Sequence, residues 1–313
     1  MIEAIDLRLE SLDLTLYPEI GGSVGRFRWR HPEGRWVDLL RPTDRGAIAA
    51  LNSAGVACYP LTPFSNRVRN GRFSFAGQSY VLPLNTDGPH AQHGHGWQRA
   101  WAMLSRDDAC ASIGFTHDPR CDQTWPFAYQ AWQDFSLSED GLSITIGARN
   151  LDSRAMPIGL GLHPYFLRTP GCRLTADVDG FWEVDREVMP VSHRDVPRAL
   201  DLRPGLVMHD VVIDNVFTGF AGEALITWPE HGAKLRLRAG PQLPFLVVYS
   251  PDASSIAAEA ARGVPAYFCA EPVSNITDAF NLAHVAPPVK TGLIVLPPGG
   301  ETSATVTMQV ESF

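Results

Sequence analysis

The amino-acid sequence predicts an all-β protein built as a large antiparallel β-sandwich with few short helices. First, apolar residues alternate with polar or small ones over many segments, and a period of two places them on one face of a strand. The clearest run carries Leu142, Ile144, Ile146 and Ala148. Second, turn signals such as Ala76-Gly77 and Pro298-Gly299-Gly300 separate these segments at the spacing of hairpins. Third, strands and helices do not alternate regularly, which argues against a parallel sheet.

Individual elements follow from local patterns along the chain. Residues 73–82 should form a hairpin around Ala76-Gly77, because aromatic side chains flank that turn on both sides. Residues 159–166 read as an apolar strand, and Pro164 should end it, since proline cannot donate to a β-ladder. Two helical segments are expected, a single turn near residues 48–51 and a helix over residues 254–262 with Gly263 as its C-cap.

Length, charge and composition limit the possible classes of protein. The 313 residues contain no low-complexity linker and no convincing repeat, so residues 1–313 are expected to form a single domain. A formal net charge of −8 and the lack of a basic run argue against a nucleic-acid partner. No apolar segment is long enough to span a membrane, and the acidic N-terminus lacks the pattern of a secretory signal. Five scattered cysteines fit reduced thiols, so a cytoplasmic location is expected.

Histidines are concentrated in residues 85–97, where His90, His93 and His95 are interleaved with Gly and Pro. Imidazole is the commonest transition-metal ligand in proteins, so the stretch suggests a metal site. The simpler interpretation is a loop surface with exposed imidazoles, and the stretch alone does not decide between them.

Ionisable residues also occur inside or beside apolar runs, where a charge is costly unless it is paired or used. Arg67 follows Asn66 directly after one such run, and His163, Asp214 and Glu271 lie at or within three others. Each has a structural alternative. His163 could be a core histidine with its hydrogen bonds satisfied, and Asp214 could be a turn residue. Glu271 could be a buried carboxylate paired with an arginine such as Arg67. Arg67 could instead be a solvated charge at a strand edge.

Taken together, these segments resemble the aldose 1-epimerase (galactose mutarotase) family. The recurring blocks of that family stand here in family order: PFSNRVRNGRFSFAGQSYVLPLN, HGHGW, GLGLHPYF, IDNVF, AEPVSNITDAFN and LPPGGE. The resemblance implies a large antiparallel β-sandwich that binds a small-molecule aldose sugar in a cleft on a sheet face. It implies no cofactor and no metal.

The resemblance also implies roles for particular residues. His163 corresponds to the general acid and Glu271 to the general base. The residues expected to bind the sugar are Arg67 with its neighbour Asn66, His93, Asp214 and Trp97, with Phe166 as a second candidate for an apolar face. Departures from the family pattern put the sugar preference in doubt: Gln92 replaces Leu, His95 replaces the second Gly, and Asn275 and Thr277 replace His and Pro.

The expected activity is interconversion of α and β anomers by ring opening and reclosure. One proton leaves the C1 hydroxyl and another reaches the ring oxygen, and a positioned carboxylate and imidazolium can serve both transfers. For this, His163 should be held cationic by nearby negative charge such as Glu271 or Asp214, while Glu271 stays ionised.

Three other functions stay open at this level. A hexose-6-phosphate mutarotase would need further cations, which Arg69, Arg72 or Arg99 could supply. A carbohydrate-binding or sensing sandwich would need no acid–base pair. A metal-dependent sugar isomerase would draw on His93, His95 and Glu271. The preferred sugar, the pathway served, the roles of His90 and His95, and the choice between monomer and homodimer are not decided by the sequence.

Overall fold

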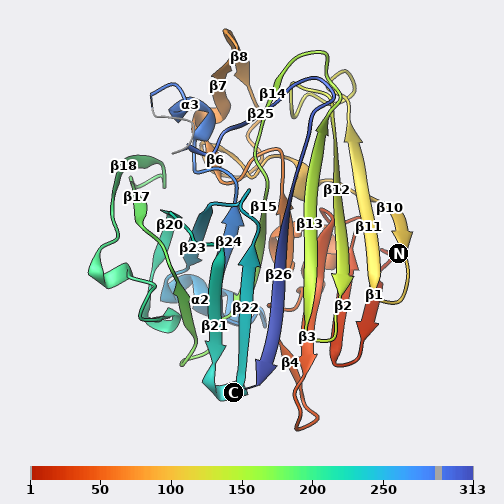
Figure 1. The fold of residues 1–313 in the computed structure, drawn as a ribbon, viewed down its shortest axis with the longest axis vertical. Helices are drawn as coiled ribbons and strands as arrows, with labels where there is room; N and C mark the ends of the chain where they lie inside the picture. Colours follow the sequence, from red (N-terminus) through yellow and green to blue (C-terminus); the bar gives the residue numbers. More distant parts are fainter. Residues whose placement is uncertain (1, 286–290, 313) are drawn as a thin grey trace.

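The computed structural model describes residues 2–285 and 291–312. Two large sheets pack face to face, as predicted, and their long strands cross the whole molecule (Figure 1). The pairings between strands within these two sheets are antiparallel. The predicted antiparallel β-sandwich is therefore confirmed.

A nine-stranded sheet forms one layer of the sandwich, in front in Figure 1. In spatial order its strands are β10 (Ala102–Arg106), β11 (Cys110–His117), β12 (Tyr129–Leu137), β13 (Gly141–Asn150), β26 (Glu301–Ser312), β22 (Ala233–Ala239), β21 (Glu223–Trp228), β16 (Arg173–Ala176) and β19 (Leu206–Val207). The alternation read from the sequence is visible in β13, where Leu142, Ile144 and Ile146 are buried.

An eleven-stranded sheet forms the second layer. In spatial order its strands are β1 (Ile5–Leu9), β2 (Leu12–Tyr17), β3 (Ser23–Arg30), β5 (Cys58–Leu61), β15 (Gly161–Leu167), β24 (Tyr267–Val273), β23 (Phe245–Ser250), β20 (Ile213–Thr218), β17 (Gly180–Val184) and β18 (Pro190–Asp195), with β4 (Trp36–Asp38) paired to β3.

In the part of the chain that the structure describes, three two-stranded sheets and three short α-helices complete the fold. The small sheets are β6 (Arg67–Val68) with β9 (Ala91–Gln92), β7 (Arg72–Phe75) with β8 (Gln78–Val81), and β14 (Met156–Ile158) with β25 (Ile294–Leu296). The helices are α1 (Arg45–Ala50), α2 (Ala253–Ala260) and α3 (Ala279–Leu282). The hairpin of β7 and β8 confirms the prediction for residues 73–82. None of the helices in the described part of the chain is long and apolar enough to cross a membrane.

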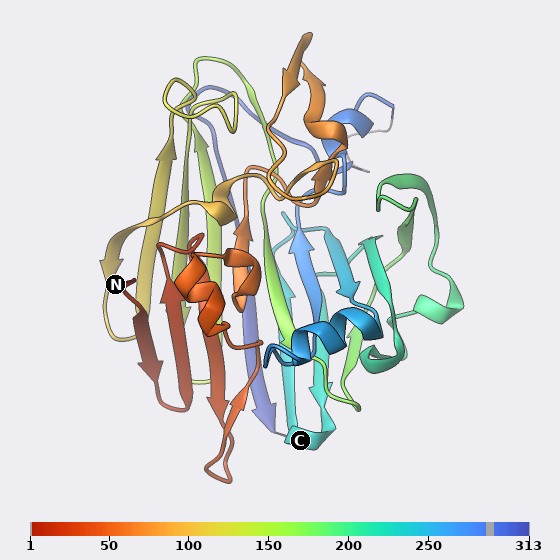
Figure 2. The same ribbon diagram turned by 180° about the vertical axis from the view of Figure 1, so that it is seen from behind.

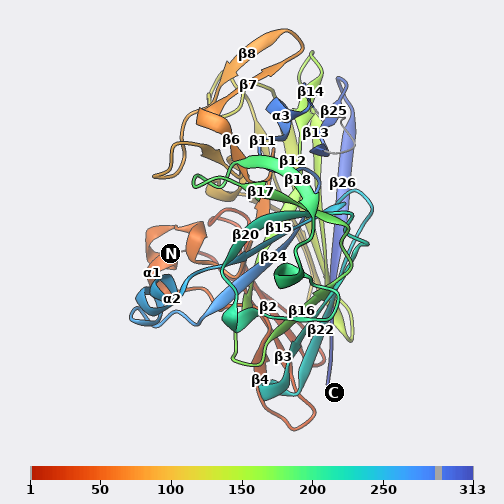
Figure 3. The ribbon, with the colours of Figure 1, turned by 90° about the vertical axis from the view of Figure 1, so that its left-hand side faces the viewer.

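Both predicted helical segments exist with shifted ends. The helix expected over residues 254–262 is α2, which begins one residue earlier because the Asp252 side chain accepts a hydrogen bond from the Ser255 N–H at 2.8 Å. It ends before Gly263, and Ala261 occupies the C-cap. The turn near residues 48–51 belongs to α1, whose cap is Asp44. Helices α1 and α2 lie outside the eleven-stranded sheet (Figures 2 and 3).

Alternation along the central strands separates the two faces of the eleven-stranded sheet. In β24, Phe268 and Ala270 belong to the core between the sheets, whereas Tyr267 and Cys269 belong to a smaller cluster on the other face. Strand β15 alternates in the same way, with Phe166 in the core and Tyr165 in the smaller cluster. The outer face of these strands is thus available for a site. It is the face on whose side α1 and α2 lie (Figures 2 and 3).

The prediction that Pro164 ends its strand is wrong, because β15 continues to Leu167. The proline is accommodated at a gap in the pairing with β24. The residue pairs Gly161↔Val273 and Tyr165↔Cys269 have no paired position between them, and the intervening segments contain two residues without an N–H, Pro164 and Pro272. On the other side, Pro164 still lies opposite Cys58 of β5.

One cluster of buried apolar side chains runs through the sandwich from Ile5 near the N-terminus to Val310 near the C-terminus. It includes side chains from both large sheets, such as Phe27, Phe166 and Trp228. A continuous core of this kind supports our proposal that the chain forms a single domain.

Candidate active site

A cavity of about 430 Å³ lies on the outer face of the eleven-stranded sheet. Its floor is formed by β5, β15, β24, β23 and β20, and the loops before and after β9 contribute its wall. All seven residues predicted for the site line it: Asn66, Arg67, His93, Trp97, His163, Asp214 and Glu271. The structure therefore brings together side chains that are up to about two hundred residues apart in the chain.

His163 and Glu271 face each other across β15 and β24. His163 lies midway between Gly161 and Tyr165, and Glu271 lies midway between the partners of those residues, so the register sets the two side chains opposite one another on the outer face. His163 Nε2 is 3.2 Å from Glu271 Oε1, and the two residues are 6% and 2% exposed. His163 Nδ1 and Glu271 Oε2 are buried without a hydrogen-bond partner.

The pKa shifts of the two residues oppose the expectation of a cationic His163 beside an ionised Glu271. Burial lowers the pKa of His163 to about 3, with the positive charge of Arg41 acting in the same direction. Burial also raises the pKa of Glu271 well above its usual value, and the negative charge of Asp214 adds to this. Because both shifts oppose charge, we assign the free pair a neutral state in which one proton is shared between the carboxyl group and the imidazole.

Arg67 and Asp214 form an ion pair at the side of the cavity. Arg67 Nη2 lies 3.4 Å from Asp214 Oδ2, and Arg67 Nη1 donates to Asn66 Oδ1 at 3.1 Å. Burial raises the pKa of Asp214, and the guanidinium of Arg67 opposes that shift. The pair therefore holds a cation and a carboxyl oxygen next to the space that a ligand would occupy, so it can both donate and accept hydrogen bonds.

The ring of His93 is fixed by the backbone of Asn66. The Asn66 N–H donates to His93 Nδ1 at 3.0 Å, and the His93 N–H donates to the Asn66 carbonyl at 2.7 Å. Both residues have positive φ angles near 59°. Because Nδ1 accepts, the neutral ring carries its proton on Nε2, which lies 3.1 Å from the side-chain amide of Gln92. Burial lowers the pKa of His93 well below its usual value, so the ring is a neutral donor at the cavity wall.

Gly94 allows this turn, and its replacement by alanine is expected to cost about 1–3 kcal/mol of folding stability. Gly94 has a φ of +68°, and an added Cβ would lie 2.3 Å from the Thr62 carbonyl oxygen. Gly77→Ala is the matched control, because Gly77 has a φ of +76° but no atom within 4 Å of an added Cβ. Urea denaturation of both variants checks this; equal losses would show that the Thr62 contact does not matter.

Aromatic side chains that were not predicted form much of the cavity. Trp97 stacks on Tyr59 with ring centroids 5.1 Å apart, and Tyr165 stacks on His163 at 4.7 Å. Tyr249 and Tyr267 also line the cavity. The signal was present in the sequence, because Tyr165 and Tyr267 stand an even number of residues from His163 and Glu271. Such spacing puts them on the same strand faces.

Phe166 was a candidate for the sugar-facing surface, and the structure corrects this. Phe166 is fully buried in the core between the sheets and contacts Phe268 and Trp228. It follows Tyr165 in a strand, so the two side chains point to opposite faces. Tyr165 takes the position proposed for Phe166.

Arg41 is a buried cation that the sequence did not single out. It is 2% exposed, and its guanidinium lies over the rings of Tyr165 and Tyr267 at 3.8 Å and 4.3 Å. Its Nη2 donates to the carbonyls of Ala54 and Val56, and its Nη1 is 3.5 Å from Glu259 Oε2. Tyr165 lies beside both Arg41 and His163. The positive charge of Arg41 disfavours protonation of His163, which explains part of the lowered pKa of that histidine.

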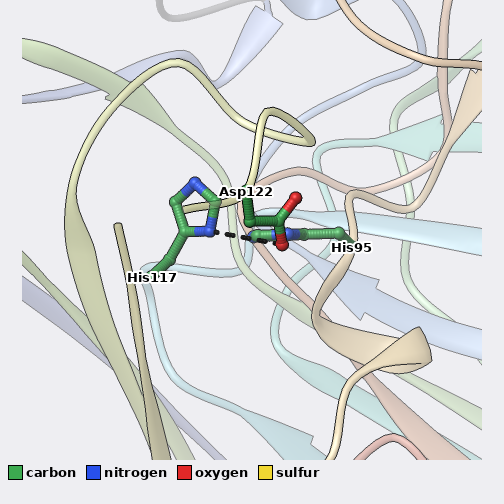
Figure 4. Close-up of side chains that lie close together, drawn as sticks. All are labelled: His95, His117 and Asp122. Carbon is green, nitrogen blue, oxygen red and sulfur yellow. Dashed lines mark ion pairs between the residues drawn. The ribbon is translucent and has the colours of Figure 1, made fainter. Parts of the chain in front are cut away.

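His95 lies outside the cavity, in a separate buried cluster with His117 and Asp122 (Figure 4). Its Nε2 is 2.7 Å from the Tyr129 hydroxyl, and its Nδ1 accepts from Arg99 Nε at 3.1 Å. Arg99 also pairs with Asp122, so its guanidinium supplies the positive charge there. The combination of His93, His95 and Glu271 proposed for a metal-dependent isomerase is therefore not assembled.

The interpretation of residues 85–97 as a loop with exposed imidazoles is wrong, because His90, His93 and His95 are all buried. His90 Nδ1 accepts from the Asn70 N–H at 3.1 Å, and its Nε2 is 3.4 Å from Glu187. These partners are distant in sequence, so nothing local indicates the burial. His90 serves to hold the segment that carries Arg69 and Asn70 against the histidine stretch.

The arginines considered for a phosphate do not line the cavity. Arg69 is 3.8 Å from Asp278, Arg72 lies exposed in the β7–β8 hairpin, and Arg99 belongs to the His95 cluster. Among the described residues that line the cavity, Arg67 is the cationic side chain, and it is already paired with Asp214. Because the cation of the cavity lining is already paired, the cavity favours an uncharged ligand.

Of the departures from the family pattern, Asn275 has a clear structural role. Its side-chain oxygen accepts from the Ser65 N–H at 3.1 Å, and the Ser65 hydroxyl donates to its carbonyl at 2.7 Å. Asn275 therefore ties down the segment that leads into Asn66 and Arg67.

The fold and the site define a β-sandwich protein that holds a buried carboxyl–imidazole pair in a polar, sugar-sized cavity. Residues 16–309 match the family model described as aldose 1-epimerase. The chain belongs to this family, as the sequence blocks suggested.

Individual relatives agree with that assignment. The chain is 30% identical over 285 residues to the uncharacterised protein YphB of Escherichia coli strain K12, covering 89% of this chain and 92% of that protein. It is 25% identical to the galactose mutarotase of Rattus norvegicus, covering 56% and 58% of the two chains. The crystal structure of a putative aldose 1-epimerase from Escherichia coli K12 superposes with a TM-score of 0.87 at 27% identity over 100% of both chains.

Proposed function

We propose that the protein is an aldose 1-epimerase, an isomerase that interconverts the α and β anomers of a free aldose. The observation that carries the proposal is the pair of His163 and Glu271, 3.2 Å apart at the floor of the cavity, each with one buried polar atom left without a partner. Buried polar atoms without partners are costly, and two of them at one site indicate a place that a ligand completes.

The reaction moves two protons in opposite directions. Glu271 accepts the proton of the C1 hydroxyl as the C1 carbonyl forms, the C1–O5 bond breaks, and His163 donates a proton to the ring oxygen. Rotation about the C1–C2 bond presents the other carbonyl face, and reclosure returns both protons. The pair holds one proton before and after the cycle, so no other acid, base or cofactor enters the balance.

The neutral state of the free pair sets a requirement for this mechanism. The shared proton must move from Glu271 to His163 before the ring opens, which creates opposite charges 3.2 Å apart. A sugar hydroxyl that donates to Glu271 Oε2, and a sugar oxygen that accepts from the protonated Nδ1 of His163, would favour the charged form. Binding of the substrate and charging of the pair are therefore one event in this proposal.

Arg67, His93 and Asp214 are proposed to orient the sugar. Arg67 and His93 Nε2 offer donors, Asp214 offers an acceptor, and Trp97 with Tyr59 offers an apolar ring face. Such positioning holds the reacting atoms in line with the acid and base. A protein that only bound sugar would need the donors and acceptors but not a buried pair that shares a proton.

The test is exchange spectroscopy by NMR on glucose, galactose and arabinose at anomeric equilibrium. The wild-type protein is expected to accelerate α–β exchange of at least one of them, undiminished in EDTA. Failure on all of them, with the protein folded, would leave a carbohydrate-binding role. The same measurement on glucose 6-phosphate decides the phosphate alternative, which requires a clear preference for that sugar.

The rate is expected to stay constant with pH through 6.5, where an ordinary histidine titrates. Below the lowered pKa of His163, near 3, a second proton enters the pair and the base is lost. Above the raised pKa of Glu271 the shared proton leaves and the acid is lost. The measurement is kcat/KM against pH, corrected for uncatalysed exchange. An inflection near pH 6.5 that moves on substitution of His163 would contradict the assignment of a neutral pair.

Arg67→Met is expected to raise KM about 10- to 100-fold with a smaller effect on kcat, since a charge-assisted hydrogen bond contributes about 1.5–3 kcal/mol. It also leaves Asp214 without its cation. Arg69→Met is the control, because Arg69 lies outside the cavity lining and pairs with Asp278. Steady-state kinetics on the preferred sugar checks this; a loss confined to kcat would reassign Arg67 to the chemical step.

A further inference from the structure

Beside the acid–base pair lies a third side chain that the proposed reaction does not use, the thiol of Cys269. It stands two residues before Glu271 in β24 and therefore on the same face of the strand. The sulfur of Cys269, a ring nitrogen of His163 and a carboxylate oxygen of Glu271 all lie within 4.8 Å of one another. Thiolate, imidazole and carboxylate are the three ligand types that zinc prefers.

The spacing of two of these atoms already suits a tetrahedral ion. His163 Nε2 and Glu271 Oε1 are 3.2 Å apart. Tetrahedral zinc with nitrogen and oxygen ligands at about 2.0–2.1 Å requires about 3.3–3.4 Å between them. The Cys269 sulfur, within 4.8 Å of both atoms, would move closer to become the third ligand, and three protein ligands leave the fourth position of the ion open. This open position is the arrangement of zinc sites that exchange a ligand.

The charges of the three ligands match a divalent cation. A thiolate and a carboxylate together carry two negative charges, so the complex with Zn²⁺ is neutral, which suits a buried position. The neighbouring cations are already paired, Arg67 with Asp214 and Arg41 with Glu259. Binding releases the thiol proton and the proton that His163 and Glu271 share.

The contrast with the His95 cluster shows why this site differs. There the guanidinium of Arg99 pairs with Asp122 and donates to His95 Nδ1, so a cation is built into the protein. The guanidinium groups nearest His163 and Glu271 belong to Arg41 and Arg67, which pair with Glu259 and Asp214 rather than with these two residues. Glu271 Oε2 and His163 Nδ1 are buried and without partners, so an incoming ion meets unpaired polar atoms.

We propose that Cys269, His163 and Glu271 form a site for Zn²⁺ at the floor of the cavity, and that the bound ion blocks the acid–base pair reversibly. The ion and the sugar compete for the same two side chains, so each should exclude the other. The inhibition rests on the proposed mutarotase activity, whereas the binding does not.

Cobalt(II) is the probe for binding, because a cobalt–thiolate bond gives a charge-transfer absorption band in the near ultraviolet. The wild-type protein, reduced and freed of metal, is expected to show this band at one equivalent of Co²⁺ and to lose it on addition of Zn²⁺. Cys269→Ser and Cys269→Ala should lack the band and bind Zn²⁺ at least about 10-fold more weakly by calorimetry. Cys58→Ser is the matched control, since Cys58 is a buried thiol on the neighbouring strand β5 outside the ligand set, and it should keep the band.

Activity is the second readout. Zn²⁺ should slow anomer exchange of the wild-type protein, EDTA should restore it, and excess sugar should raise the Zn²⁺ concentration needed. The proposal is overturned if folded wild-type protein gives no thiolate band, or if Cys269→Ala keeps the band. A thiolate band in a protein without anomer exchange would retain the metal site and sink the mutarotase proposal alone.

Discussion

Replacing Glu271 with glutamine is expected to slow anomer exchange by about 10²- to 10⁴-fold, the usual contribution of a positioned base. The amide has the shape of the carboxyl group and can still hydrogen-bond His163, but it cannot accept the proton of the C1 hydroxyl. The loss should therefore fall mainly on kcat. Measurement is by NMR exchange on the preferred sugar, with far-ultraviolet circular dichroism to check the fold.

Glu230→Gln provides the control for this experiment. Glu230 lies outside the cavity lining, and its carboxylate accepts from the Thr169 hydroxyl and the Gly171 N–H. Its replacement should leave the exchange rate within a factor of about two to three of the wild type, since it touches no proposed catalytic group. If Glu271→Gln also exchanged at nearly the wild-type rate, Glu271 would not be the base.

His163→Asn is the second substitution with a large expected effect, again about 10²- to 10⁴-fold in kcat. Asparagine keeps a polar group at the strand position but cannot deliver a proton to the ring oxygen. The double variant with Glu271→Gln should lose little more than either single variant, because the two residues work on one shared proton.

The control for the histidine is His193→Asn, an exposed imidazole whose Nε2 lies 2.8 Å from the Thr218 hydroxyl. It should retain full activity. A fully additive double variant would indicate that His163 and Glu271 act in separate steps, and an active His163→Asn protein would move the acid to another cavity residue, with His93 Nε2 as the next donor.

Much of the fold was predictable because the strands carry a simple physical signal. Residues such as Leu142 and Ile144 must alternate with solvent-facing positions if one face of a strand is buried, and that alternation can be read without knowing the partner strand. Pro164 was wrongly predicted to end its strand, since a proline ends a strand only when its missing N–H is needed for pairing. Here the pairing with β24 is interrupted at that point.

The residues that line the cavity at the candidate site could be predicted from the family blocks, whereas the electrostatics of the cavity could not. His163 and Glu271 were identified as residues, yet their neutral state depends on burial by side chains such as Tyr59, which comes from the neighbouring strand β5. The same limitation hid the burial of His90 and His95, which contact Asn70 and Tyr129 from other parts of the chain. Local patterns report which face a residue occupies, but not what will cover it.

The alternation along β24 has a consequence for folding as well as for catalysis. Tyr267, Cys269 and Glu271 occupy the cavity side only in the observed register, and a slip by one residue would carry Ala270 there and force the carboxyl group of Glu271 into the apolar layer between the sheets. The slipped register would be strongly destabilised, because it buries a carboxyl group without a hydrogen-bond partner. The carboxyl group of Glu271 therefore disfavours the slipped register. The residue proposed as the catalytic base thus also favours correct pairing of the strands in the sheet.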